Sequence, residues 1–544
     1  MVRLIIYDEE EYMKKYTKIL CLILSFIFLI NTTTYAAETK NISTQKDIEV
    51  PIKYICESLG GTVSWNGDDR TALIKYKNKT LQIKIDSNDI VIDGKTVTIK
   101  DKVKSIKGRI LLPISVLNQY LDLKLTNDEC LKIIGITFID LLKKNKIDDC
   151  SGLLSDPFSI YLSSKSLLQI KDFLSSVILD NENVSLTKNT VHQSLSFPFT
   201  ISQKKYNYVI KFDYDSKIDE LSSIAVQPYV SYSKPSYEEA DKFTEEEVTI
   251  GKGAWKLPAT LTVPKGKGTF PVIILVHDAG PNDRDESLGA LKPFRDLSVG
   301  LASNNVAVLR YEKRTLEHAT KMALIGNVTL NEETEQDVFA AAAYLKNCDK
   351  IDSSNIVLLG HGIGGYALPK IMNADTSDVF KAGIVMSGYS RSLYEVLPEQ
   401  LEYFVTRGLA DESMLRNIKA QIKILDDASF DPTKPPENYT LGDAYFYSYM
   451  KTYDVLGEAK ALDKPMLVLQ GERDYLVNSK IDFGRWGTAL SGNKEAEFKL
   501  YTKLNHLYTE GEDDFLPNEY FISANIPKYV IDDILNFVNK TTGK

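Results

Sequence analysis

The chain has 544 residues, of which 43% are hydrophobic and 26% charged, and its formal net charge is -9. Because a single hydrophobic core stops growing at roughly 250–300 residues, we expect two or three domains. The composition is that of a folded globular protein and excludes a disordered chain. The acidic balance argues against nucleic acid or an anionic lipid surface as a partner, since both require a basic face.

The first residues have the pattern of a targeting segment. Three lysines at positions 14, 15 and 18 precede an apolar run from Ile19 to Ile30, and Tyr35-Ala36-Ala37 follows after a polar stretch. This pattern predicts a signal peptide over residues 1–37 and a secreted or cell-surface protein. An uncleaved N-terminal anchor is the alternative, although the run is shorter than the about 20 apolar residues that cross a bilayer. Because acidic residues precede the lysines, Met13 is an alternative start to Met1.

Cysteine is sparse after this segment. Cys56, Cys130, Cys150 and Cys348 are scattered and form no disulfide framework, so we expect buried free thiols, with a Cys130–Cys150 pair as the alternative. No CxxC motif or Cys/His cluster indicates a metal site. We therefore expect neither a metal nor another cofactor.

Residues 40–128 predict a small β-rich module. Short runs with period-two alternation lie at 62–65, 71–74, 81–85 and 97–99, bounded by turn-forming residues, and two helical patches flank them at 52–59 and 113–121. Through Val63-Ser64-Trp65 and Gly108-Arg109-Ile110-Leu111-Leu112-Pro113, this stretch resembles the copper amine oxidase N-terminal-like domain of secreted bacterial proteins. It contains no histidine to hold copper, so we interpret it as a non-catalytic module that associates with a cell-envelope component.

Residues 131–232 predict a small α+β domain. Helical patterns at 134–142 and 167–174 precede strand-like alternation at 206–214 and 224–230. The segment Ser231–Thr244, which contains a dense acidic run, is the predicted linker to the next domain.

Residues 245–544 predict an α/β domain in which apolar strands alternate with helices, as in a mostly parallel sheet covered on both faces. The predicted strands are 272–277, 307–311, 356–359, 382–387 and 465–470. Loops that follow such strands form the ligand-binding edge of an open α/β sheet. We therefore expect the site residues in these loops.

The strand at 356–359 runs into Gly360-His361-Gly362-Ile363-Gly364-Gly365 and then into a helical stretch. A strand, a tight Gly-x-Ser-x-Gly turn and a helix make the nucleophile elbow of the α/β-hydrolase fold. Here the nucleophile position is occupied by Gly362.

The other members of a hydrolase site follow in the order that this fold requires. Asp474 comes just after the strand at 465–470, in the position of the acid, and His506 lies in a later loop, in the position of the base. The loop after the first strand of the domain carries Asp278 and Ala279, and its backbone together with the N–H of Ile363 is the predicted oxyanion hole.

The motifs Pro281-Asn282-Asp283-Arg284-Asp285, Leu469-Gln470-Gly471-Glu472-Arg473-Asp474-Tyr475 and Leu504-Asn505-His506 closely resemble EstD-type bacterial carboxylesterases of the α/β-hydrolase superfamily. The resemblance covers about residues 245–540 and implies ester hydrolysis with a small ester-like or amide-like ligand. The family pattern has Gly-His-Ser-x-Gly-Gly at the elbow and His-Gly-Ser-Gly-Pro at the oxyanion loop, where this chain has Gly362 and Asp278. Both departures oppose ester hydrolysis, because one removes the attacking hydroxyl and the other brings negative charge toward the oxyanion.

We therefore expect a carboxylesterase-related protein whose activity is impaired or lost, a pseudoenzyme. Two alternatives stay open: a non-catalytic cell-surface ligand-binding protein, and a hydrolase in which His506 activates a water in the space left by the serine. Ser387, just after a predicted strand, is a further nucleophile hypothesis, but an ordinary loop hydroxyl is the favoured interpretation. For His277 and His361 we expect structural hydrogen bonds within tight loops.

Overall fold

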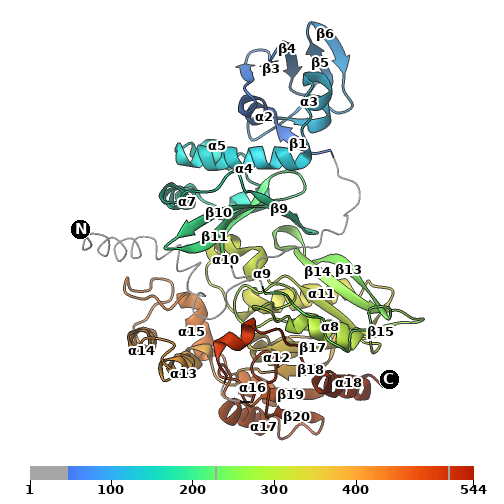
Figure 1. Ribbon diagram of the computed structural model, residues 1–544, viewed down its shortest axis with the longest axis vertical. Helices are drawn as coiled ribbons and strands as arrows, with labels where there is room; N and C mark the ends of the chain where they lie inside the picture. The colour runs from blue at the N-terminus through green and yellow to red at the C-terminus, as the bar shows by residue number, and fades with distance from the viewer. Residues whose placement is uncertain (1–46, 227–229, 513–514, 544) are drawn as a thin grey trace. The chain divides into compact units, whose positions relative to one another are not determined.

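The computed structural model describes residues 47–226, 230–512 and 515–543, and these divide into two compact units (Figure 1). The boundary lies between Val226 and Gln227. The predicted signal peptide lies outside the described residues. Within the described ranges, no helix combines the length and the apolarity that a bilayer span requires.

The first unit begins with the β-rich module. The period-two runs form a five-stranded antiparallel sheet in the order β2-β3-β4-β5-β6, so the predicted hairpins are confirmed, and β1, β8 and β7 form a second small sheet. The side chains of Ile74, Leu81 and Ile90 are buried on one face, as the alternation requires. The elements are β1 (Glu49–Pro51), α2 (Ile52–Ser58), β2 (Thr62–Asn66), β3 (Thr71–Tyr76), β4 (Lys79–Lys84), β5 (Asp89–Ile92), β6 (Lys95–Thr98), β7 (Lys104–Ile106), β8 (Arg109–Pro113) and α3 (Ile114–Leu121).

The rest of this unit consists of helices followed by an antiparallel sheet in the order β12-β11-β10-β9, as predicted. A capping box begins α4: the Thr126 side chain accepts from the Glu129 N–H, and the Glu129 side chain accepts from the Thr126 N–H. Of the strand predicted at 224–230, Ile224 and Ala225 belong to β12, which begins earlier, at Ile218, and residues 227–229 lie outside the described residues. The elements are α4 (Asn127–Lys143), α5 (Ile147–Ser151), α6 (Asp156–Tyr161), α7 (Ser164–Ser176), β9 (Ser185–Lys188), β10 (Gln193–Ile201), β11 (Lys204–Phe212) and β12 (Ile218–Ala225).

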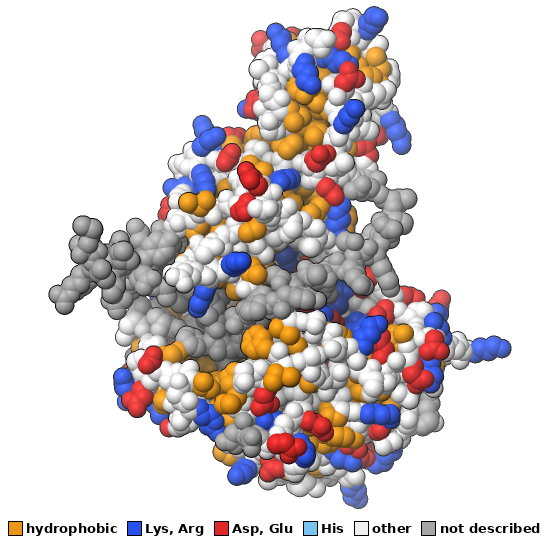
Figure 2. All heavy atoms as spheres, in the orientation of Figure 1, with side chains coloured by type: hydrophobic (Ala, Val, Ile, Leu, Met, Phe, Trp, Pro, Cys, Tyr) orange, Lys and Arg blue, Asp and Glu red, His pale blue; other side chains and the backbone are white. Residues whose placement is uncertain are grey.

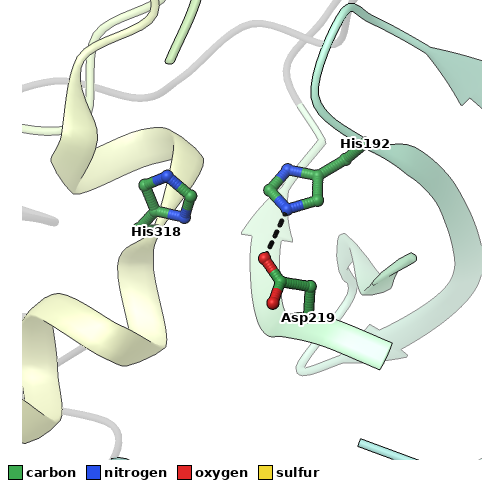
Figure 3. Close-up of side chains that lie close together, drawn as sticks. All are labelled: His192, Asp219 and His318. Carbon is green, nitrogen blue, oxygen red and sulfur yellow. Dashed lines mark hydrogen bonds and ion pairs between the residues drawn. The ribbon is translucent and has the colours of Figure 1, made fainter. Parts of the chain in front are cut away.

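One histidine–carboxylate pair lies inside this first unit. His192, just before β10, directs its Nε2 to Asp219 Oδ2 on β12 at 2.9 Å, and Asp219 Oδ1 accepts from the Ser155 hydroxyl; Figure 3 draws the His192–Asp219 pair. The pair links two strands to the start of α6. His318, drawn in the same figure, belongs to the second unit, where its Nε2 donates to the Lys256 carbonyl at 2.8 Å.

The second unit is built on an eight-stranded sheet in the order β13-β14-β16-β15-β17-β18-β19-β20. β14 is antiparallel to both of its neighbours and the remaining pairs are parallel, which is the arrangement of the α/β-hydrolase fold and confirms the predicted fold class. The strands are β13 (Phe243–Ile250), β14 (Leu257–Pro264), β15 (Phe270–Val276), β16 (Ala307–Tyr311), β17 (Ile351–His361), β18 (Phe380–Met386), β19 (Met466–Gly471) and β20 (Ala496–Tyr501).

Helices cover both faces of this sheet. Along β15, Ile273 and Leu275 pack in a core with α8 (Pro293–Ala302) and α18 (Lys528–Thr542), whereas Ile274 and Val276 pack in a second core on the opposite face. That opposite face is covered by α11 (Gln336–Leu345), α12 (Ile363–Asn373), α16 (Val455–Lys460) and α17 (Gly484–Ala489). Strands with two covered faces are apolar throughout, which explains the continuous apolar runs in the sequence.

The connections carry the remaining short elements, and α13, α14 and α15 form an insertion between β18 and β19. These elements are η1 (Gly253–Trp255), α9 (Arg314–Glu317), α10 (Ala319–Ile325), η2 (Asn331–Glu335), α13 (Leu393–Val405), α14 (Glu412–Asp426), α15 (Ala444–Thr452), η3 (Ser479–Phe483) and η4 (Pro517–Phe521).

The cysteines of the described residues are free thiols, as expected: Cys56, Cys130 and Cys150 are buried and Cys348 is half-buried. Acidic and basic side chains are interspersed on the face that Figure 2 draws, and no histidine is seen there. The three histidines of the second-unit loops that the sequence singled out are all buried: His277, His361 and His506.

Candidate active site

Gly362 lies in a tight turn between β17 and α12. Its backbone has φ 51° and ψ -113°, and its N–H donates to the Met386 carbonyl at 3.1 Å. A Cβ at Gly364 would lie 2.8 Å from the His277 carbonyl oxygen, and closer still to that of Val276, so only glycine allows this turn to pass so near β15. The predicted elbow is therefore present, with a positive-φ glycine at its centre.

The side chain of Asp278 occupies the space beside Gly362. A Cβ built on Gly362 would overlap the Asp278 carboxylate, with Oδ2 at 2.7 Å and Oδ1 closer. Asp278 Oδ1 also accepts a hydrogen bond from the Ile363 N–H at 2.7 Å. Because that N–H is the predicted oxyanion donor, one carboxylate fills the space that a side chain at residue 362 would need and also engages the predicted donor.

The acid and the base lie together at the same carboxyl edge of the sheet. His506 Nδ1 contacts Asp474 Oδ2 at 2.8 Å, and His506 Nε2 contacts Asp278 Oδ2 at 3.1 Å. Asp474 Oδ1 is fixed by the N–H groups of Leu476 and Val477. The structure thus brings the predicted residues Asp474, His506, Gly362, Ile363 and Asp278 into one buried cluster.

The two carboxylates set the charge of the imidazole between them. Burial works to lower the pKa of His506, but the carboxylates of Asp474 and Asp278 outweigh burial and raise the pKa to about 10. Burial works in the opposite direction on Asp278, yet its hydrogen bond and ion pair with His506 hold the pKa of that carboxyl below its usual range. The three side chains form a carboxylate–imidazolium–carboxylate chain.

Glu286 is a site residue that sequence reasoning missed. Its Oε1 accepts from the Asp278 N–H at 2.6 Å, and its Oε2 contacts His361 Nδ1 at 2.7 Å. Burial tends to raise the pKa of Glu286, but His361 and His277 outweigh it and hold that pKa well below its usual range. Glu286 follows directly after the motif that ends at Asp285. Its position next to that motif was the one sequence signal that could have predicted a role in the site.

His277 and His361 make hydrogen bonds to the backbone, as expected. His277 Nε2 donates to the Tyr311 carbonyl at 2.6 Å, and His361 Nε2 donates to the His506 carbonyl at 3.0 Å. The rings of His361 and His506 lie 4.5 Å apart, centroid to centroid. His361 therefore helps to position the loop that carries His506.

The oxyanion loop is held in place by buried ion pairs. Arg284 Nε donates to Glu312 at 2.7 Å and Arg310 Nε donates to Asp285 at 2.9 Å, while Lys313 Nζ donates to the Asp278 carbonyl at 2.7 Å. These contacts connect the loop to the carboxyl end of β16.

The structure bears on the two alternative nucleophiles, a water activated by His506 and the hydroxyl of Ser387. The space that a directly activated water would need beside His506 is filled by the Asp278 carboxylate, so the geometry contradicts the water hypothesis. Ser387 is fully buried after β18, and its hydroxyl lies 3.5 Å from the Tyr508 hydroxyl. It is a loop hydroxyl in a tight turn, with φ 48°.

A cavity of about 650 Å³ borders the cluster on the side of Asp474. Its described lining includes none of Gly362, Asp278 or His506. Aromatic rings form part of its wall: Tyr475 stacks on Tyr403 and on Phe515. The lining residues are Tyr403, Glu472, Arg473, Asp474, Tyr475, Glu512 and Phe515.

Comparison with known proteins identifies the family. Residues 318–413 match the Prolyl oligopeptidase family. Esterase EstD of Thermotoga maritima is 30% identical over 409 residues, which cover 74% of this chain and 94% of EstD. The chain belongs to the EstD esterase family. Since residues 227–544 cannot supply 409 aligned positions, the family likeness extends into the first unit.

The N-terminal module and the fold have further relatives. Residues 29–135 match the Copper amine oxidase N-terminal domain, which confirms that resemblance. A structure of Est1E from Butyrivibrio proteoclasticus is 18% identical, with a TM-score of 0.36, and the match covers 55% of this chain and 99% of that chain. The Pyrococcus furiosus esterase Pf2001 is 14% identical, with a TM-score of 0.35, over 58% of this chain and 98% of that chain.

Proposed function

We propose that this member of the esterase family has lost serine-type ester hydrolysis and is a pseudoenzyme. The observation that carries the proposal is the overlap between the Asp278 carboxylate and the position of a side chain at residue 362. A serine hydrolase needs a hydroxyl at that position, and removing it from such an enzyme lowers turnover by about a millionfold. Glycine supplies no attacking atom.

The position of Asp278 opposes the reaction at two further steps. An ester carbonyl must place its oxygen at the oxyanion donors as negative charge develops there. The Ile363 N–H already donates to Asp278 Oδ1, and the N–H of Asp278 itself donates to Glu286. His506 Nε2, which would take the proton of the nucleophile, faces Asp278 Oδ2. The N–H groups of Ile363 and Asp278 and the imidazole of His506 are thus engaged by side chains of the protein.

The test is an esterase assay of the wild-type chain on short p-nitrophenyl acyl esters, paired with a fluorophosphonate probe read by mass spectrometry. We expect hydrolysis at the background rate and no modified serine, Ser387 included. Turnover above background that His506→Ala abolishes would overturn the proposal, and so would a labelled serine in the second unit.

A second candidate function is the binding of a small ester-like or amide-like ligand without turnover. The cavity of about 650 Å³ beside Asp474 favours it, because stacked aromatic side chains and charged groups line one enclosure. Ferulic acid is bound in one structure of Est1E, a protein to which this chain is similar. Tyr475→Ala should abolish a thermal shift given by such a ligand, and a shift that persists would exclude this cavity.

Secretion or display at the cell surface, with or without a retained N-terminal anchor, is part of the same proposal. The apolar run at 19–30 and the copper amine oxidase N-terminal-like module support it, the latter as the part that would contact a cell-envelope component. Fractionation of the producing cells tests it: the mature chain is expected in the medium or on the envelope, and a purely cytoplasmic chain of full length would exclude it.

A further inference from the structure

Asp278, His361 and His506 form a cluster that ester chemistry does not use. One donor atom of each side chain lies within 4.8 Å of the corresponding atoms of the other two, and all three residues are buried. They come from the loops after β15 and β20 and from the last position of β17. Two imidazoles and one carboxylate are a ligand set that binds Zn²⁺ in proteins.

The surroundings of the two histidines match those of metal ligands. His506 Nδ1 contacts the Asp474 carboxylate at 2.8 Å and His361 Nδ1 contacts the Glu286 carboxylate at 2.7 Å. A ligating histidine usually donates its second ring N–H to a carboxylate or a carbonyl, which fixes the ring and leaves the other nitrogen for the metal. Here the Nδ1 atom of each ring contacts a carboxylate. On both rings Nε2 is therefore the nitrogen that would bind a metal.

The charge of the cluster also suits a cation. Asp278, Glu286 and Asp474 are three buried carboxylates, and their cationic contacts within the described residues are with histidines alone. Buried charges are stable when they are paired or coordinate a metal.

The geometry points to a Zn²⁺ site whose ligands are a carboxylate oxygen of Asp278 and the Nε2 atoms of His361 and His506. Asp278 Oδ2 and His506 Nε2 lie 3.1 Å apart, a separation that two ligands at about 2.0–2.2 Å from one ion can adopt. Binding replaces the proton shared by these two atoms with the metal and releases it to solvent. His361 Nε2 exchanges its hydrogen bond with the His506 carbonyl for a bond to the ion.

The inference goes beyond the proposed loss of ester hydrolysis. His361 and His506 stand where the esterase pattern also has histidine, whereas Asp278 replaces its glycine. The third ligand is therefore an addition made by the same substitution that fills the oxyanion hole. The site could not be read from the sequence, because its ligands are separated by more than eighty residues at each step.

The experiment measures metal binding by the full chain after treatment with a chelator. Isothermal titration with ZnCl₂ should give saturable binding that Asp278→Asn weakens by on the order of a hundredfold or more, because it removes a ligand charge. Asp474→Asn should weaken it about 10–100-fold through the ring that Asp474 anchors. Asp296→Asn, a buried aspartate of the same unit that contacts no imidazole, is the matched control and should leave the affinity unchanged.

A second readout does not depend on the variants. Co²⁺ added to the wild-type chain should produce the visible absorption of a four- or five-coordinate ion with nitrogen and oxygen ligands, and Zn²⁺ should abolish it. No saturable binding by the wild type, equal affinity in Asp278→Asn, or a Co²⁺ spectrum of a fully hydrated ion would each overturn the inference. None of these results bears on the esterase assay, so the two proposals fail separately.

Discussion

Asp278 and His506 hold a carboxylate and an imidazole in the contact that a serine hydroxyl and the imidazole make in an active serine esterase. The distance from Asp278 Oδ2 to His506 Nε2 is 3.1 Å, and the other carboxylate oxygen takes the Ile363 N–H. An anion of the protein itself therefore rests where the transient anion of ester hydrolysis would be stabilised. Residues 278 and 362 are consequently coupled, because the side chain of one occupies the space beside the other.

Removing the imidazole should destabilise the second unit. In metal-free protein, His506→Gln leaves two buried carboxylates, Asp278 and Asp474, without their cationic partner, which costs about 3–5 kcal/mol. Chemical denaturation followed by the fluorescence of buried Trp486 measures this cost. Adding Asp278→Asn should recover part of the loss, whereas two additive losses would mean that the residues do not interact.

Gly362→Ser alone should also lower stability. The new Cβ meets the Asp278 carboxylate, and a φ of 51° disfavours a side chain, so we expect a loss of about 2–4 kcal/mol. In an Asp278→Gly background the overlap disappears and only the backbone strain remains. The same denaturation assay compares the four chains, and an equal cost of the serine in both backgrounds would show that Asp278 does not occupy that space.

The glycine after the elbow tests how closely the turn approaches β15. Gly364→Ala would place a Cβ 2.8 Å from the His277 carbonyl oxygen and closer to that of Val276, so it should unfold or strongly destabilise the second unit. Gly484→Ala in α17 is the matched control, since nothing lies within 4 Å of its added Cβ, and it should be neutral or slightly stabilising. Equal stability of the two variants would contradict the close approach.

Asp296 should make stability depend on pH. Burial raises the pKa of this carboxyl to about 7, although hydrogen bonds from Tyr232, Ile526 and Asn525 work to lower it. Because the folded state binds the proton more tightly, its contribution is complete below about pH 4 and is lost as pH rises through 7. Relative to Asp296→Asn, the wild type should lose on the order of 2–3 kcal/mol between pH 5 and 8. A pH-independent difference between the two chains would show that Asp296 is ionised throughout.

Much of the fold follows from local patterns in the sequence. The parallel strands of the second unit are continuous apolar runs because both of their faces are covered, and the first-unit hairpins alternate because one face is exposed. β13 and β14 were missed, since β13 carries three successive glutamates and β14 has prolines at Pro258 and Pro264, which are weak strand signals. The start of β12 at Ile218 was missed because its pairing with β11 is a tertiary property.

The sequence was sufficient to predict which residues form the site, but not which side chains contact each other there. Strand ends and chain order placed Gly362, Asp474 and His506, because the fold brings those loops to one edge of the sheet. The sequence indicated that Asp278 opposes an oxyanion, but its overlap with residue 362 depends on a side-chain conformation that joins loops 84 positions apart. The contacts of Glu286 with Asp278 and His361 likewise depend on the tertiary fold, which no local sequence pattern encodes.

The most direct measurement is the kcat/KM for a short p-nitrophenyl ester in the wild type, Gly362→Ser, Asp278→Gly and the double variant. The account predicts background rates for the first three and a rise of at least about a thousandfold in the double variant, which regains both the hydroxyl and the oxyanion donor. Gly362→Ser alone reaching the rate of the double variant, or substantial wild-type turnover, would contradict it.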